Sequence, residues 1–181
     1  GVGTVKAIEQ GVRADCFINM EPTDLNGLTL HAGSFNVVIE LTGVTRHVSK
    51  REESVDAIAA AAALVPRFNT MTFSGAANAD HATVNRANIG VVRGSLTQNF
   101  HDWRPPQVAD FARLAGTVRY GPSQSEKSVI GDIEVLLGEL ESNMPGLRTS
   151  VFKQHAGERP SMLPFESGLK NPVVAAISNA Y

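Results

Sequence analysis

The chain has 181 residues, a mass of 19.3 kDa and a formal net charge of −2, which is the size of one globular domain. With 43% hydrophobic and 19% charged residues it carries enough apolar surface to fold, so a disordered chain is excluded. A pI near 6.2 gives the domain no overall basic character, so we expect no nucleic-acid partner.

Cysteine content and hydropathy indicate the cellular compartment of the protein. Cys16 is the only cysteine, so an intramolecular disulfide is impossible and a cysteine-rich zinc site is excluded. No apolar run approaches the roughly 20 residues of a membrane helix, and no secretion signal is visible. We therefore expect a cytoplasmic protein with no membrane partner. The chain starts at Gly1 without Met and ends at Tyr181 in an apolar stretch, which favours an excised piece of a longer protein over a trimmed natural terminus.

The first third of the sequence predicts one helix and two strands. Val2–Gln10 predicts a short helix that Gly11 ends. Cys16–Met20 predicts a short buried strand that ends before Pro22, because proline cannot donate to a sheet ladder. Over Phe35–Leu41 apolar and polar residues alternate, which predicts a half-buried strand.

Two capping boxes predict the starts of two amphipathic helices. Ser49 and Glu52 have the spacing of one box, before a helix that runs to Pro66. Ser123–Glu126 has the spacing of the other, before a helix that stops at Pro145. Further strands are predicted over Val84–Arg93, Phe111–Tyr120 and Leu147–Phe152.

The order strand–helix–strand–strand–helix–strand predicts an α+β fold. We expect a two-layer ferredoxin-like sandwich, with a four-stranded antiparallel sheet and two helices. This domain would span residues 27–154. Residues 1–26 and residues 155–181, the latter beginning as a linker, would belong to another domain.

Four residues are candidates for chemistry, although no phosphate loop, nucleophile elbow or local metal motif is present. Glu21 follows a predicted strand, where ligands collect in α/β proteins, or is a surface residue before a turn. His47 lies in a loop before a predicted helix and is either functional or a solvated loop histidine. Asn99 lies in a polar loop and is either a hydrogen-bond donor or a turn former. Arg119 could recognise a carboxylate through its planar fork, or form a cross-strand salt bridge.

In their order and spacing, several segments resemble one metallopeptidase family. It includes acetylornithine deacetylase, succinyl-diaminopimelate desuccinylase, aminoacylase and glutamate carboxypeptidase. The residues around His47 resemble the family's Gly-x-x-x-His-x-Ser, and Asp56 stands where the family commonly has Asn. The segments that carry the resemblance are Val12–Thr23, Gly43–Ser49, Asp56–Ile58, Arg93–Gly94 with Asn99, and Thr117–Pro122.

The resemblance implies a piece of a two-zinc hydrolase that cleaves the amide of an N-acyl amino acid or small peptide. The piece would be the lid domain, through which the enzyme forms a homodimer. Glu21 would be one zinc ligand, and His47 would reach into the partner's active site to stabilise the oxyanion. Asn99 and Arg119 would help to bind the substrate carboxylate or the tetrahedral centre.

The family's other zinc ligands are absent from the chain. We therefore expect the piece alone to be inactive and to hold no zinc tightly. The alternative is a freestanding ferredoxin-like module that binds a partner or a small molecule without catalysis.

Overall fold

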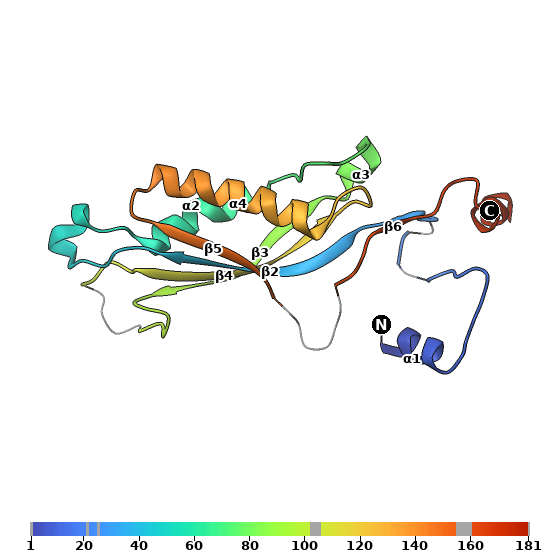
Figure 1. The fold of residues 1–181 in the computed structure, drawn as a ribbon, viewed down its shortest axis with the longest axis horizontal. Coiled ribbons are helices and arrows are strands. Elements are labelled where there is room, and N and C mark those ends of the chain that lie inside the picture. Colours follow the sequence, from blue (N-terminus) through green and yellow to red (C-terminus); the bar gives the residue numbers. More distant parts are fainter. Residues whose placement is uncertain (1, 21, 25, 102–105, 155–160, 181) are drawn as a thin grey trace. The chain divides into compact units, whose positions relative to one another are not determined.

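The computed structural model describes residues 2–20, 22–24, 26–101, 106–154 and 161–180 (Figure 1). These residues fall into two compact units. One spans residues 30–166, and the other combines residues 1–29 with residues 167–181. None of the described helices has the length and apolarity needed to cross a membrane.

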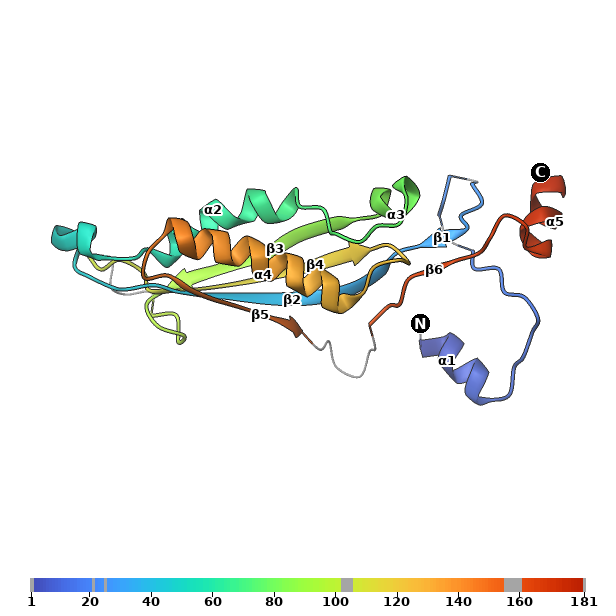
Figure 2. The same ribbon diagram turned by 45° about the horizontal axis from the view of Figure 1, so that its top comes forward.

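The larger unit confirms the predicted fold class. Its sheet has the strand order β3-β4-β2-β5 with every neighbouring pair antiparallel, and helices α2 and α4 cover one face (Figure 2). Each helix connects two parallel strands separated by a third, which is the ferredoxin-like arrangement. The elements are β1 (Leu30–His31), β2 (Gly33–Thr42), a 3-10 helix (Val48–Glu53), α2 (Ala57–Asn69), α3 (Ala79–Thr83), β3 (Arg86–Ser95), β4 (Phe111–Tyr120), α4 (Glu126–Asn143), β5 (Arg148–Gln154) and β6 (Phe165–Glu166).

The core lies between the sheet and the two helices. Val37, Ile39 and Leu41 of β2 are fully buried, whereas Asn36 before them and Thr42 after them are exposed on the other face. Of the two residues between them on that face, Glu40 is half-buried and Val38 is buried. This is the period-2 alternation that the sequence predicts. The helices contribute buried residues at helical spacing, notably Leu64, Phe68, Val129, Ile133, Leu137 and Leu140.

Helix α2 begins later than the capping box predicted. Its N-cap is Asp56, whose carboxylate accepts hydrogen bonds from the backbone N–H groups of Ile58 and Ala59, each at 3.0 Å. Ser49 and Glu52 lie instead in the 3-10 helix. The predicted box was wrong because the backbones of Val44 and Val55 pair reciprocally at 2.9 Å, so the chain turns back before α2 starts.

Two other helix boundaries differ from the prediction. Helix α2 continues through Pro66 to Asn69, because Leu64 and Phe68 on either side of the proline are fully buried and hold the last turn in place. Helix α4 is capped two residues later than predicted, by Ser125 with Ser128 closing the box.

The smaller unit contains helices α1 (Val2–Glu9) and α5 (Pro172–Ala180). Helix α1 agrees with the predicted helix, but Cys16–Met20 forms no strand. Its apolar residues, including Phe17 and Met20, are exposed. A strand needs a hydrogen-bonding neighbour, and these residues pair with no strand among those the structure describes.

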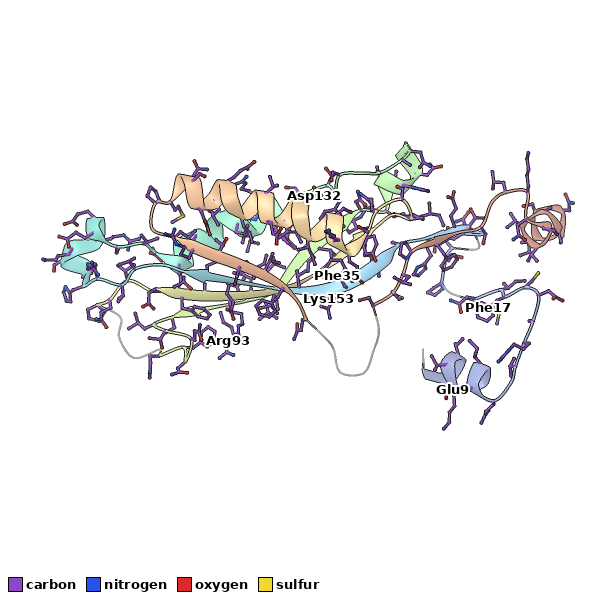
Figure 3. The ribbon with its side chains drawn as sticks, viewed as in Figure 1. Glu9, Phe17, Phe35, Arg93, Asp132 and Lys153 are labelled. Atoms are coloured by element: carbon purple, nitrogen blue, oxygen red, sulfur yellow. The ribbon has the colours of Figure 1, made fainter. Side chains whose placement is uncertain are left out.

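A β-bulge in β3 decides which side chains face away from the helices. The register of β3 against β4 shifts between Ile89 and Val91, which reverses the alternation along the rest of the strand. Arg93 therefore lies on the sheet face opposite α4 (Figure 3), where its guanidinium stacks 4.2 Å from the centre of the Phe100 ring. Gly94 faces α2, where a Cβ atom would meet Ile58 at 2.6 Å.

Replacing Asp56 tests the position of the cap. Asp56→Ala should lower the free energy of unfolding by about 1 kcal/mol, because two N–H groups lose their acceptor. Asp56→Asn should lower it less, and Glu52→Ala, the matched control in the predicted box, should leave it unchanged. Urea denaturation measures all three; a larger loss for Glu52→Ala would contradict the assigned cap.

Tyr120 makes stability depend on pH. It is 1% exposed and packs edge-to-face against Phe35; burial, and secondarily the negative charge of Glu126, raise the pKa of its hydroxyl above 10.0. As pH rises, Tyr120 ionises at a lower pH in the unfolded chain than in the folded one. The contribution of Tyr120 to the free energy of unfolding is therefore complete below about pH 10 and is lost as pH rises through the folded pKa.

Tyr120→Phe should remove that pH dependence. Between about pH 8 and about pH 11 the unfolding free energy should fall less for the variant than for the wild type, as measured by urea titration at each pH. Equal slopes for the two proteins would show that Tyr120 ionises normally in the fold.

Candidate functional site

His47 is exposed and is held in one orientation by its own loop. It is the N-cap of the 3-10 helix, and its Nδ1 accepts from the Ser49 N–H at 3.2 Å and lies 2.9 Å from the Ser49 hydroxyl. The loop is tied to the segment before β4, where Val48 donates to Pro106 and Val108 donates to Arg46. With Nδ1 accepting, the neutral ring carries its proton on Nε2, which is free of partners among the described residues and can donate outward.

Asn99 lies at the same end of the sheet as His47. It belongs to the turn that joins β3 to β4, and this turn is closed by pairing of Leu96 with His101. The Asn99 N–H donates to the Thr97 hydroxyl at 3.3 Å, and the side chain is exposed. The Asn99 amide is therefore available at the surface of this turn.

Arg119 lies at the opposite end of the sheet. It is the penultimate residue of β4, paired with Ser34 of β2, whereas His47 follows the far end of β2. At about 3.4 Å per residue, β4 places roughly 27 Å between these two ends. One copy of the chain therefore does not bring His47 and Arg119 together. The alternative for Arg119, a cross-strand salt bridge, does not form among the described residues, because its neighbours across the strands are Ser34 and Arg86.

The expected zinc ligand cannot be placed. Glu21 lies outside the described residues. Within the ranges that the structure describes, no group of three His, Cys, Asp or Glu side chains could hold a metal ion. The described part of the chain therefore does not fit a zinc site by itself.

The face of the sheet opposite the helices carries an arginine that the sequence reasoning missed. Arg86 of β3 pairs directly with Arg119 of β4, so both side chains leave this face side by side. Both residues are exposed. The strand predictions included both segments, but only the register of β3 against β4 places the two arginines opposite each other.

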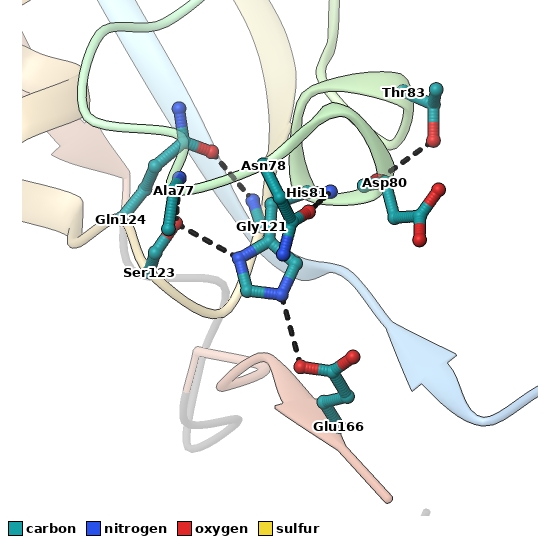
Figure 4. Close-up of polar contacts among 9 residues, drawn as sticks. All are labelled: Ala77, Asn78, Asp80, His81, Thr83, Gly121, Ser123, Gln124 and Glu166. Atoms are coloured by element: carbon teal, nitrogen blue, oxygen red, sulfur yellow. Dashed lines mark hydrogen bonds and ion pairs between the residues drawn. The ribbon is translucent and has the colours of Figure 1, made fainter. Parts of the chain in front are cut away.

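A buried histidine forms a second polar cluster that the sequence did not reveal (Figure 4). His81 of α3 is 7% exposed, with Nδ1 3.0 Å from the Ser123 hydroxyl and Nε2 3.0 Å from the Glu166 carboxylate. Because an ionised carboxylate only accepts, Nε2 of the neutral ring donates to Glu166 and Nδ1 accepts from the Ser123 hydroxyl. The Ser123 oxygen also accepts from the Ala77 N–H at 2.9 Å.

This cluster fastens the short ribbon of β1 and β6 to the rest of the larger unit. Glu166 pairs with Leu30 in the ribbon, and the chain enters the larger unit through β1 and leaves it through β6. His81 thereby joins α3 and the loop before α4 to the segment through which both chain connections to the smaller unit pass.

No model of a known protein family matches the sequence, and no curated protein does either. Solved structures do match. A putative amidohydrolase/peptidase from Burkholderia cenocepacia aligns with a TM-score of 0.57 and 16% identity, over 84% of this chain and 33% of that chain. Aminopeptidase PepT from Bacillus cereus aligns with a TM-score of 0.55 and 18% identity, over 84% of this chain and 36% of that chain.

A hydantoinase/carbamoylase family amidase from Burkholderia ambifaria gives a similar result, with a TM-score of 0.56, 16% identity, and coverage of 84% of this chain and 33% of that chain. The chain thus spans about a third of the length of the solved structures that it matches. It has the fold of a domain found within peptidases and amidohydrolases, the same kind of protein that its sequence motifs resemble.

Two variants of the His81 cluster should show whether it stabilises the whole fold or only the β1–β6 ribbon. His81→Ala should lower the unfolding free energy by about 1 kcal/mol, because the buried ring is lost together with its hydrogen bonds to Ser123 and Glu166, which both lie at the surface. Glu166→Ala should leave global stability nearly unchanged but speed amide exchange in the β1–β6 ribbon. Urea denaturation measures global stability, and hydrogen exchange measures opening of the ribbon. Unchanged exchange of the ribbon amides in both variants would show that the cluster does not hold the ribbon.

Proposed function

We propose that the chain is the lid and dimerisation domain of a zinc-dependent amidohydrolase or peptidase. The observation that supports this most is the match of 84% of the chain to only about a third of much longer peptidases and amidohydrolases. A fold of this size within larger hydrolases agrees with the order of motifs around His47 and Arg119. The substrate would be an N-acyl amino acid or a small peptide with a free carboxylate.

The dimer contact that we propose is the free edge of β3. Among the described strands, β3 pairs only with β4, and β3 lies at the edge of the sheet. At its centre Val91 and Val92 are 52% and 51% exposed, and Ile58 of the adjacent α2 is 48% exposed. Unpaired strand edges with apolar side chains are templates for pairing with another chain, so two copies of β3 would pair antiparallel about a two-fold axis.

This pairing explains how His47 and Arg119 would act together. They lie at opposite ends of the sheet in one copy, and an antiparallel pair of β3 strands brings opposite ends of the two copies together. The His47 and Asn99 end of one protomer would then lie beside the Arg119 end of its partner. The active site would be complete only in the dimer.

In this arrangement His47 would act as an oxyanion donor. Its Nδ1 is occupied by Ser49, so Nε2–H is the group that points out of the loop toward an amide carbonyl under attack. A fixed donor aimed at a developing oxyanion contributes roughly a hundred- to a thousandfold in rate. Arg119 would hold the substrate carboxylate by a two-pronged hydrogen bond.

The zinc ions would be bound largely outside this chain. The resemblance makes Glu21 one ligand, and the described residues supply no other candidate cluster. Bound zinc would polarise the scissile carbonyl and activate water in the complete enzyme. We propose that the chain alone binds no zinc tightly and hydrolyses no amide.

Sedimentation equilibrium tests the dimer. We expect a mass near twice 19.3 kDa. Val92→Lys should raise the dissociation constant at least about tenfold by placing a charge in the proposed contact. Val135→Lys is the matched control and should leave the mass unchanged, because Val135 is an exposed valine of α4 away from β3.

A monomer at all concentrations would contradict the proposed contact and favour the freestanding module. A dimer that Val135→Lys dissociates and Val92→Lys does not would place the contact on α4 instead of β3.

A further inference from the structure

The helix-free face of the sheet carries two rows of polar side chains at its β1–β6 end. The first row crosses three strands as Arg86, Arg119 and Ser34. The next row crosses them as Asn88, Thr117 and Asn36. The hydroxyls of Ser34 and Thr117 lie 3.5 Å apart between the two rows. None of the α-helices described in the larger unit covers this face (Figure 2).

The two arginines are held differently. The Arg86 guanidinium is fixed by its Nη1, which donates to the carbonyls of Thr83 at 2.7 Å and Asn85 at 2.6 Å. Its Nε and Nη2 have no partner among the described residues. Arg119 forms no ion pair with a described carboxylate, and both arginines are exposed.

Like charges directly opposite on neighbouring strands repel each other and destabilise the pairing. Elsewhere on the same face the structure avoids this cost, because Arg113, which lies opposite Arg93, forms an ion pair with Glu40. Arg86 and Arg119 have no such carboxylate among the described residues. The free donors of both arginines, with hydroxyl and amide groups beside them, form a surface that fits an anion.

We infer that Arg86 and Arg119 together form an anion site that selects substrates with two carboxylates. The inference rests on the proposed function: Arg119 binds the carboxylate next to the scissile amide, and Arg86 binds a second carboxylate on the same molecule. The ligand class is therefore an N-acylated acidic amino acid, or an amino acid whose acyl group is itself acidic. Arg86 is the specificity-determining residue.

Binding of two near-isosteric probes to the 181-residue chain tests this inference. N-acetylglutamate carries two carboxylates, and N-acetylglutamine replaces one of them by a neutral amide. Titrations followed by NMR should show backbone and arginine Nε shifts in residues 86–88 and 117–119. We expect N-acetylglutamate to bind about tenfold more tightly, with the preference falling as salt is added.

Three variants assign the effect. Arg86→Gln should remove the preference, because it weakens N-acetylglutamate binding more than N-acetylglutamine binding, and Arg119→Gln should weaken both probes. Arg148→Gln is the matched control, because Arg148 is an exposed arginine of β5 at the other end of the same face. It should change neither affinity.

The inference is overturned if the preference persists in Arg86→Gln, if Arg148→Gln removes it equally, or if neither probe shifts these residues. Its failure is distinguishable from failure of the proposed function. A chain that forms the β3 dimer but shows no preference for the dianion retains the proposed lid function and loses only the assigned specificity. A monomer that binds the dianion through Arg86 retains the site without the lid function.

Discussion

The pairing of β2 with β4 over their full ten-residue lengths is the constraint on which the rest of the structure depends. It places β2 in the interior of the sheet, with β5 on its other side, and fixes which side chains of both strands face the helices. Gly116 in β4 allows β3 to lie close on the other side of β4. A Cβ atom at Gly116 would collide with the backbone carbonyl of Asn88 in β3. A one-residue slip of one strand against the other would move the apolar set of the slipped strand to the open face.

The same register separates the candidate residues. His47 follows one end of β2, and Arg119 pairs with Ser34 near the other end. A rigid sheet cannot bring its two ends together, so one copy of the sheet does not place both residues at one substrate. The proposed two-fold pairing through the exposed valines of β3 would bring His47 of one copy near Arg119 of the other.

The bulge in β3 determines which face of the sheet its arginines occupy. It leaves Arg86 opposite Arg119 before the shift and turns Arg93 to the same open face after it. All of the arginines that leave β3 and β4 therefore lie on the face that the helices leave uncovered. Arg93 and Arg113 are held there by Phe100 and Glu40. Arg86 and Arg119 remain available to an anion.

The His81 cluster holds the β1–β6 ribbon, through which the chain connects the larger unit to the smaller one. The buried polar ring of His81 is satisfied by Ser123 and Glu166 at the surface, so removing either partner would leave a ring nitrogen without its hydrogen bond. Fastening the ribbon in this way gives the larger unit a defined point where both connecting segments leave it. A domain that must be positioned relative to a neighbour benefits from such a point.

The sequence by itself determined the fold class, because alternation over β2 and helical spacing in α2 and α4 are local patterns set by burial. It also located His47 and Arg119 on the loop and strand where they lie. Only the tertiary structure decided the cap at Asp56, the bulge in β3, the pairing of Arg86 with Arg119 and the cluster at His81. Each of these depends on contacts between residues distant in sequence, whose register is fixed by packing of the whole sheet rather than by any local preference.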